Sequence, residues 1–295
     1  MTYGWLIANS SLQTDKFNDY SRWFQKAAAR KGIELDLVWN SDLQVAFDRF
    51  GKREFRPPAN RGIPDFIHFA DKDLHLGEHL EANGIRLFNS TRAIGLCDNK
   101  ARMHAALSGH GLPVPKTVIA PKVYDGCEQG NPYFLKQVIS LLGLPLIVKE
   151  AYGSFGRQVF KAETPEELEA IVRGIGSREM IFQEMITEST GTDVRLNVVG
   201  DEVVASMKRT SVTDFRANVT TGGSAEPWVP STEEKELAVS AARAAGADFA
   251  GVDLLFGRDG PVLCEINSNP HIRSIYECTG VDVAPYMIDY ILNAI

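Results

Sequence analysis

The chain begins with short apolar runs that alternate with amphipathic segments. Residues 5–8 predict a buried strand, 16–31 a helix ended by Gly32, and 33–38 a half-buried strand with alternating side chains. A strand, a helix and a second strand in this order form a right-handed βαβ unit. The pattern continues with a strand at 66–69, a helix at 72–83 and a strand at 86–88. We therefore expect residues 1–96 to form a small α/β domain.

A glycine loop between two apolar runs marks the middle of the chain. Residues 144–150 predict a strand, the loop 153–156 follows it, and 158–161 predict the returning strand. A strand, a glycine loop and a strand in this order are typical of a hairpin whose backbone N–H groups cover phosphate. The neighbouring segments are predicted as a helix at 99–110, a strand at 116–120 and a helix that begins at Thr164.

The last third of the chain alternates strands with one long helix. The predicted elements are strands at 181–185, 194–199 and 203–208, a polar loop at 213–226, and an alanine-rich helix at 232–245. Two further strands, 250–256 and 261–267, are joined by the turn 257–260 and should pair antiparallel.

Composition excludes several classes of protein. Hydrophobic residues make up 44% and charged residues 23% of the chain, as in ordinary globular proteins. The net charge of −7 argues against a nucleic-acid or anionic-membrane partner. The longest apolar stretch, 138–148, is too short to cross a bilayer, and the first nine residues lack a signal-peptide pattern. The four cysteines form no CxxC pair, so we expect neither a zinc ribbon nor disulfides, and a cytoplasmic location.

Three oxygen-bearing side chains of the last predicted hairpin could hold a metal ion. Glu265 and Asn267 are two residues apart on one strand and share a face, and Asp253 can join them from the partner strand. Carboxylate and amide oxygens suit magnesium, which would also offset the cost of burying two acids. The alternative is a solvated hairpin whose polar face is acidic.

A second group of residues could bind phosphate. Lys149 ends an apolar strand just before the loop that contains Gly153, Ser154 and Gly156, whose N–H groups could hold phosphate oxygens. Basic residues on later strands and loops could line the same cleft: Arg195, Lys208, Arg209 and Arg216. Taken singly, each of these residues could equally be a solvated surface charge.

In their order along the chain, these segments resemble the ATP-grasp ligases, and within them the RimK-type α-L-glutamate ligases. The resemblance extends over residues 97–295 and only in outline to the residues before them. It rests on the segments 98–100, 148–150 with 153–156, 183–186, 191–195, 214–218, 250–253 and 265–270.

The resemblance implies an α/β chain with an α+β ATP-grasp fold. A pre-grasp α/β domain at 1–96 would precede a two-lobed ATP-grasp domain with the nucleotide between its lobes. The first lobe, 97–189, would carry the lid, and the second, 190–295, would carry the metal site.

The implied reaction is ATP-dependent ligation of a carboxylate to an amine through an acylphosphate, with release of ADP and phosphate. Phosphoryl transfer needs positioning and charge neutralisation, which lysines and magnesium supply. The implied partners are an amino-acid donor, glutamate by default, and a carboxylate acceptor that is a small molecule, a peptide or a protein C-terminus. The number of subunits stays open, a homo-oligomer included.

The resemblance also assigns roles to individual residues. Arg195 and Arg216 would be catalytic, and Asp253, Glu265 and Asn267 would hold two Mg²⁺ or Mn²⁺ ions. The expected nucleotide contacts are Lys100 and Lys149 with phosphates, Gly153, Ser154, Phe155 and Gly156 in the lid, Glu184 and Met185 at the adenine, Asp193 near the ribose, and Arg216 with Asn218 in the nucleotide loop.

The chain departs from the family pattern at two places. Arg157 and Gln158 follow the glycine loop where further glycines are usual. His271 stands in place of the usual glycine after the metal strand, and Arg273 adds a cation beside the expected acceptor site. Substrate identity is therefore open. A different amino acid, or a nucleotide-binding module without catalysis, remains an alternative.

One short motif suggests a different chemistry. His75, Glu78 and His79 match the HxxEH pattern of inverted zinc peptidases. A zinc site also needs a third ligand and a cleft. Neither is indicated by the sequence, so we interpret the match as a chance one on a surface helix. We expect His68, His104 and His110 to be packed or solvated.

Overall fold

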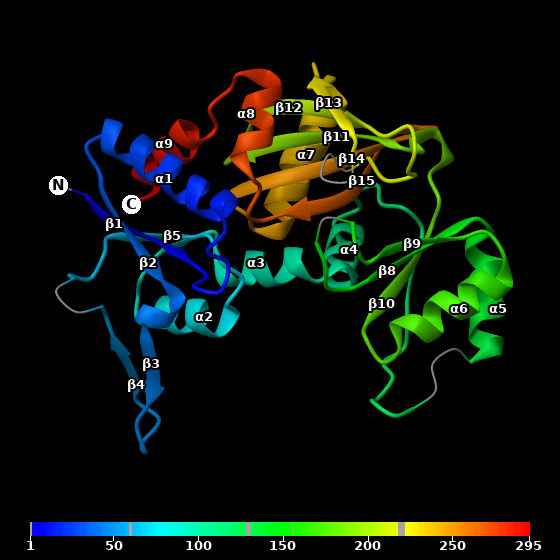
Figure 1. The fold of residues 1–295 in the computed structure, drawn as a ribbon, viewed down its shortest axis with the longest axis horizontal. Helices are drawn as coiled ribbons and strands as arrows, with labels where there is room; N and C mark the ends of the chain where they lie inside the picture. Colours follow the sequence, from blue (N-terminus) through cyan, green and yellow to red (C-terminus); the bar gives the residue numbers. More distant parts are fainter. Residues whose placement is uncertain (1, 59–60, 128–130, 155, 218–221) are drawn as a thin grey trace.

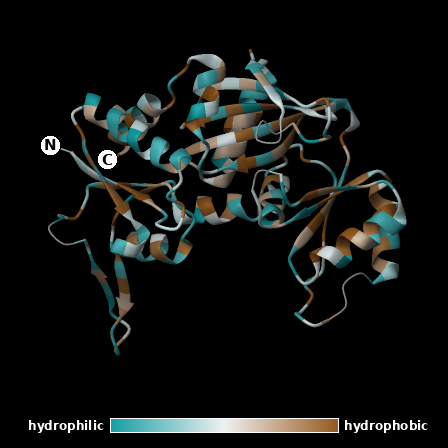
Figure 2. Cartoon of the chain, in the orientation of Figure 1, coloured by the Kyte–Doolittle hydropathy of each residue, from teal (hydrophilic) through white to brown (hydrophobic). Residues whose placement is uncertain are grey.

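The computed structural model describes residues 2–58, 61–127, 131–154, 156–217 and 222–295 (Figure 1). Three sheets follow one another along the chain, with helices packed on them. In Figure 2 the strands of these sheets carry hydrophobic residues interspersed with polar ones. No helix within the described ranges is both long enough and apolar enough to cross a membrane.

The first sheet is parallel and is covered on both faces. Its order is β2-β1-β5-β6, from the strands β1 (Tyr3–Ala8), β2 (Glu34–Trp39), β5 (Phe66–Phe69) and β6 (Leu87–Phe88). Leu6 packs with Phe24 of helix α1 (Asp15–Arg30), whereas Trp5 and Ile7 pack on the side of helix α2 (Leu74–Ala82). Strands β1 and β2 pair parallel with α1 between them in sequence, which confirms the predicted βαβ unit.

A β-hairpin that the sequence pattern did not predict projects from this sheet. Strands β3 (Gln44–Phe47) and β4 (Arg53–Arg56) pair antiparallel, after the short 3₁₀ helix η1 (Asn40–Asp42). The hairpin is attached where Phe55 packs near Trp5, with their ring centroids 6.1 Å apart. Both strands are largely exposed, so the pattern lacks the apolar face that identifies a buried strand.

The second sheet is antiparallel and carries the glycine loop. Its order is β7-β10-β8-β9, from β7 (Thr117–Ile119), β8 (Leu146–Glu150), β9 (Val159–Ala162) and β10 (Met180–Glu184). Helices α5 (Pro132–Leu142) and α6 (Pro165–Ile175) share one apolar cluster with it. Helix α5 was not predicted, because its apolar residues run without a break into strand β8. Gly143, with φ of 79°, ends the helix between them.

The third sheet forms the floor of the cleft described below. Its order is β13-β12-β11-β14-β15, from β11 (Thr192–Val199), β12 (Glu202–Thr210), β13 (Ser224–Pro227), β14 (Phe249–Gly257) and β15 (Gly260–Asn267), and η2 (Thr187–Ser189) precedes it. Helix α7 (Thr232–Ala245) packs on one face through alanines. Strand β13 lies partly in the stretch 213–226 that we predicted as loop, because pairing with β12 supplies its structure.

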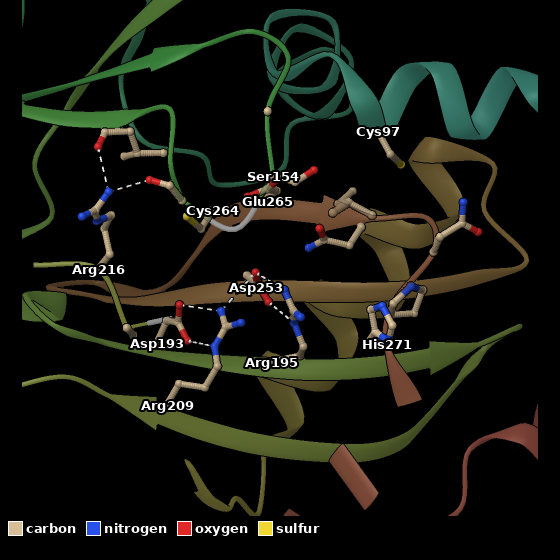
Figure 3. A pocket seen from close by; sticks show the side chains of 18 of the residues that line it. Cys97, Ser154, Asp193, Arg195, Arg209, Arg216, Asp253, Cys264, Glu265 and His271 are labelled. Carbon is tan, nitrogen blue, oxygen red and sulfur yellow. Dashed lines mark hydrogen bonds and ion pairs between the residues drawn. The ribbon is translucent and has the colours of Figure 1, made fainter. Parts of the chain in front are cut away.

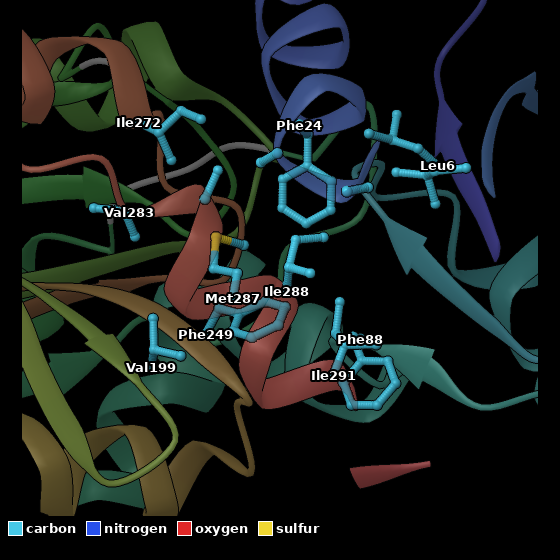
Figure 4. Close-up of a cluster of buried hydrophobic side chains, with 14 of the residues drawn as sticks. Leu6, Phe24, Phe88, Val199, Phe249, Ile272, Val283, Met287, Ile288 and Ile291 are labelled. Atoms are coloured by element: carbon cyan, nitrogen blue, oxygen red, sulfur yellow. The ribbon is translucent and has the colours of Figure 1, made fainter. Parts of the chain in front are cut away.

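Helices join the three sheets. The predicted helix at 99–110 is present as α4 (Lys100–Gly109), and α3 (Thr91–Asp98), which was not predicted, comes directly before it. Two further unpredicted helices, α8 (Ile272–Thr279) and α9 (Ala284–Ala294), return the chain to the first sheet. Residues of α9 pack with residues of α1 and the first sheet in the cluster of Figure 4. The domain limits 1–96, 97–189 and 190–295 stay a proposal: each range holds one large sheet, and α9 links the last to the first.

Phe249 tests how much this cluster contributes to stability. The ring is 1% exposed and packs against His68, Phe88 and Tyr290. We expect Phe249→Ala to lower the free energy of unfolding by about 3–5 kcal/mol, since it leaves a cavity. Urea unfolding measures the shift. The control is Phe50→Ala, because Phe50 is 80% exposed. Equal midpoints for the two variants would contradict the packing.

Candidate active site

A cleft of about 1330 Å³ lies where the three sheets meet. The second sheet contributes Lys149 and Glu184, the third contributes Arg195 and Glu265, and the first region contributes side chains of α1. Figure 3 shows Arg216 towards one end of the cleft and His271 towards the other, with Asp253 and Glu265 between them. The cleft therefore has a distinct end on each side of the acidic residues.

The structure brings the proposed metal ligands onto one face of the third sheet. Asp253 pairs with Glu265, and Gly251 with Asn267, in the antiparallel register of β14 and β15. This is the arrangement that the alternation along the hairpin predicted. A register shift follows Asp253 in the ladder.

Asp253 is bound by two arginines. Arg195 donates from Nε to Oδ1 at 2.7 Å and from a terminal nitrogen to Oδ2 at 2.6 Å, and Arg209 lies 3.1 Å from Oδ2. Burial raises the pKa of Asp253, but the two guanidinium groups outweigh it and hold the pKa below its usual range. The sequence did not indicate this pairing, because it depends on which strands neighbour β14.

Glu265 and Asn267 fit a cation more directly. The Glu265 side chain is 28% exposed, and Lys100 Nζ lies 3.5 Å from its Oε1. The Asn267 amide nitrogen donates to the Gly251 carbonyl at 3.3 Å. These hard oxygen donors suit magnesium, whereas Asp253 could join them only by sharing its oxygens with the arginines. No cluster of three or more His, Cys, Asp and Glu with metal-site geometry occurs among the described residues. The three-ligand set thus stays a prediction.

Arg209 connects Asp253 to a second buried acid. Its Nε and one terminal nitrogen each donate to a carboxylate oxygen of Asp193 at 2.6 Å, and Arg209 is 4% exposed. Burial would lower the pKa of Arg209, but Asp253 and Asp193 raise it above its ordinary value. Charges of opposite sign therefore alternate from Arg195 through Asp253 and Arg209 to Asp193. The expected ribose contact of Asp193 stays a prediction.

The two proposed phosphate lysines lie near Glu265 and its neighbour Cys264, and of the two only Lys149 lines the cleft. Lys149, on β8, is 8% exposed, and its Nζ lies 3.7 Å from Cys264 Sγ. Lys100, the first residue of α4, donates from Nζ to the Gly153 carbonyl at 3.1 Å. Lys100 therefore links the glycine loop to Glu265.

Arg216, in the loop after β12, is hydrogen-bonded to the glycine loop and the strand that follows it. This arginine donates to the carbonyls of Gly156 at 2.6 Å and Val159 at 3.3 Å, and its other nitrogens bind Asp214. Gly156, with φ of 70°, adopts a left-handed conformation that favours glycine. Gly153, Ser154 and Gly156 line the cleft. Phe155 and Asn218 lie outside the described residues.

Glu184 and Met185 line the cleft at the end of β10. The Glu184 carboxylate accepts a hydrogen bond from the Lys116 backbone N–H at 2.7 Å, and its own N–H donates to the Lys116 carbonyl at 3.0 Å. This reciprocal pairing joins the end of β10 to the residue before β7. The adenine role of both residues stays a prediction.

Arg273, the cation expected beside the acceptor site, forms an ion pair with helix α1. Arg273 binds both carboxylate oxygens of Asp19 at 2.6 and 2.5 Å, so its charge is paired.

In the HxxEH segment, His75 is exposed, whereas His79 is buried and its Nε2 contacts the Glu54 carbonyl at 3.0 Å. The two imidazoles thus have different surroundings, as expected for a chance match.

The paired charges of the third sheet give a stability prediction. Arg209→Leu leaves Asp193 buried without its bidentate partner, so we expect a loss of about 3–5 kcal/mol in the free energy of unfolding. The matched control is Arg243→Leu, which removes a 2.7 Å bond to Asp201 on the surface. That change should not shift the urea midpoint measurably. Similar shifts for both variants would contradict the buried role.

The comparisons with known proteins agree with this geometry. A RimK-like ATP-grasp domain matches residues 97–291. A protein of Methanococcoides burtonii named "Probable alpha-L-glutamate ligase" is 40% identical over 215 residues, which cover 72% of this chain and 68% of that protein.

Two solved structures share the fold. The ATP-grasp ligase PsnB, complexed with its minimal precursor, matches with a TM-score of 0.74 at 18% identity and covers 100% of both chains. A RimK domain protein from Sphaerobacter thermophilus matches with a TM-score of 0.73 at 21% identity, over 98% of this chain and 99% of that one. The expected α/β ATP-grasp fold is thereby confirmed. The chain belongs to the RimK-like ATP-grasp family.

Proposed function

We propose that this protein is an ATP-dependent carboxylate–amine ligase. A carboxylate oxygen attacks the γ-phosphorus of ATP and ADP leaves; an amine then attacks the carbonyl carbon of the acylphosphate, and phosphate leaves with the electron pair of the broken C–O bond. The observation that carries the proposal is that Lys149 and Glu265 line one cleft, while the buried Lys100 lies 3.5 Å from Glu265 and donates to the Gly153 carbonyl of the glycine loop. Membership of the RimK-like family supports it.

Different residues in and around the cleft bind the phosphates, hold the adenine and stabilise the acylphosphate. Lys100 and Lys149 bind phosphate oxygens, Gly153, Ser154 and Gly156 cover them, and Arg216 holds that loop to the segment after β12. Glu184 and Met185 hold the adenine from the end of β10. Arg195 stabilises the acylphosphate and the oxyanion formed when the amine attacks.

Magnesium ions bound by Glu265 and Asn267, with Asp253, would neutralise charge on the transferred phosphoryl group. We propose two such ions. Glu265 suits this role best, because its side chain is 28% exposed and lines the cleft, whereas the oxygens of Asp253 are bound by two arginines.

The names of similar proteins support a proposal for the amine and the carboxylate substrates. Several relatives are named as alpha-L-glutamate ligases, which favours glutamate or another amino acid as the amine. PsnB is described with a precursor peptide, which favours a peptide as the carboxylate acceptor, and a protein C-terminus or a small molecule stays open. We further propose a cytoplasmic location, and we leave a homo-oligomer as the assembly to test.

The experiment that tests the function is a screen for ADP release over pairs of amino acids and carboxylate acceptors. We expect one pair to release ADP well above the rate of ATP hydrolysis alone, with an amide product of matching mass by mass spectrometry. ADP release that never depends on any acceptor and yields no amide would contradict the proposal.

Magnesium dependence gives a prediction for Glu265. We expect an ATP analogue to bind much more tightly with magnesium, and Glu265→Gln to abolish ADP formation while the fold is kept, because the neutral amide is a weaker metal ligand. Calorimetry with and without magnesium measures the first effect. Glu163→Gln is the control, since Glu163 is exposed on the surface. Equal affinity in both conditions would remove the metal assignment.

Lys149 gives a prediction for the phosphate site. We expect Lys149→Ala to lower turnover about 100-fold or more, because it removes one preorganised charge from the phosphates. Lys122→Ala should leave turnover close to wild type, since Lys122 is exposed and lies outside the cleft lining. Steady-state ADP release compares the two, and comparable losses would exclude the phosphate role.

A further inference from the structure

The end of the cleft away from Arg216 contains a histidine that no role described above uses. His271 lines this end, between the last strand of the third sheet and helix α8 (Figure 3). The resemblance to the ATP-grasp ligases assigns it no role. The hydrogen bonds of His271 differ from those of His68, which is packed in the core.

The imidazole of His271 is oriented by ring contacts. Phe17 and Tyr20 of helix α1 meet it edge-on, with centroid distances of 5.4 and 6.0 Å and interplanar angles of 60° and 74°. Among the described residues, no hydrogen bond to either ring nitrogen is found. By contrast, the packed His68 contacts Tyr20 Oη at 2.7 Å and the Phe88 carbonyl at 3.2 Å. The nitrogens of His271 are therefore available to a substrate.

The backbone before His271 is fixed by the first region of the chain. Asn89 donates its amide to the Ser268 carbonyl at 2.6 Å, and Asn269 donates to the Asp71 carbonyl at 3.2 Å. Pro270 packs close to Gly251 of β14. A side chain held in this way can act at a defined position, as a proton acceptor must.

Charged side chains of two elements surround His271. Lys16 and Asp19 of α1 and Arg195 of β11 act on its imidazole, and Tyr20 contacts it. Burial first, and then Lys16 and Arg195, lower the pKa of His271 to about 4, whereas Asp19 opposes them. The ring is thus neutral at physiological pH. A negatively charged substrate group near the ring would oppose the effect of the cations and raise the pKa of His271.

We propose that His271 accepts the proton of the attacking amine of a carboxylate-bearing substrate. This inference rests on the proposed ligase function. The ammonium gives one proton to an imidazole nitrogen, and its freed electron pair forms the C–N bond to the acylphosphate carbon. The C–O bond to phosphate then breaks, the departing phosphate takes the second nitrogen proton, and the imidazolium returns its proton to solvent.

The test compares two nucleophiles. Hydroxylamine is largely uncharged at neutral pH and needs no base, whereas an amino acid reacts only after it loses a proton. We expect His271→Gln to form hydroxamate at close to the wild-type rate and to form amide about 100-fold or more slowly. The deficit in amide formation should shrink as pH rises, because the amine then deprotonates on its own. His75→Gln, at an exposed position of α2, is the control.

Three outcomes would overturn the inference. Equal loss of hydroxamate and amide with unchanged nucleotide affinity by calorimetry would show a packing role. A deficit in amide formation that stays constant with pH would exclude proton transfer to His271.

His271→Asn is the second variant, in case the glutamine side chain disturbs the packing of Phe17 and Tyr20. If the wild type forms neither hydroxamate nor amide with any carboxylate, the proposed function itself fails. If His271→Gln forms both hydroxamate and amide at the wild-type rate, only the role of His271 is overturned.

Discussion

The site depends on keeping carboxylates charged inside a largely buried sheet. Asp253 and Asp193 are both under 10% exposed, and ionised acids at such positions are stable only with partners. Arg195 and Arg209 supply them from neighbouring strands, at 2.6 to 3.1 Å. The Arg209–Asp253 pair spans from β12 across β11 to β14, and the register of β14 with β15 places Glu265 opposite Asp253.

The first region of the chain completes this site although it lies outside the matched ATP-grasp domain. Asn89 exchanges hydrogen bonds with the backbone of Phe249 at 2.8 and 3.0 Å and also binds the Ser268 carbonyl. Its buried amide thus joins the start of β14 to the segment after β15, with its polar atoms satisfied. Helices α1 and α9 then pack together over the first sheet. The cleft walls are therefore held relative to one another by buried contacts.

The sequence predicted those features that depend on local pattern. Alternation along a strand was enough to place Glu265 and Asn267 on one face, and the short turn after β14 was enough to bring Asp253 opposite them. The pairing of Arg209 with Asp193 could not be predicted, because it requires the register of β11 and β12. Helix α9 was missed for a related reason: its apolar face has meaning only against α1, more than 250 residues away. The ring contacts of His271 likewise join distant segments.

The central claim is that a carboxylate oxygen is transferred to phosphate during ligation. A carboxylate substrate labelled with ¹⁸O, incubated with ATP, magnesium and the amine, tests it by mass spectrometry of the released phosphate. An acylphosphate intermediate predicts one ¹⁸O atom in each phosphate released together with amide, because the C–O bond breaks on the carbonyl side of the bridging oxygen. Phosphate that carries no label while amide accumulates would contradict the account.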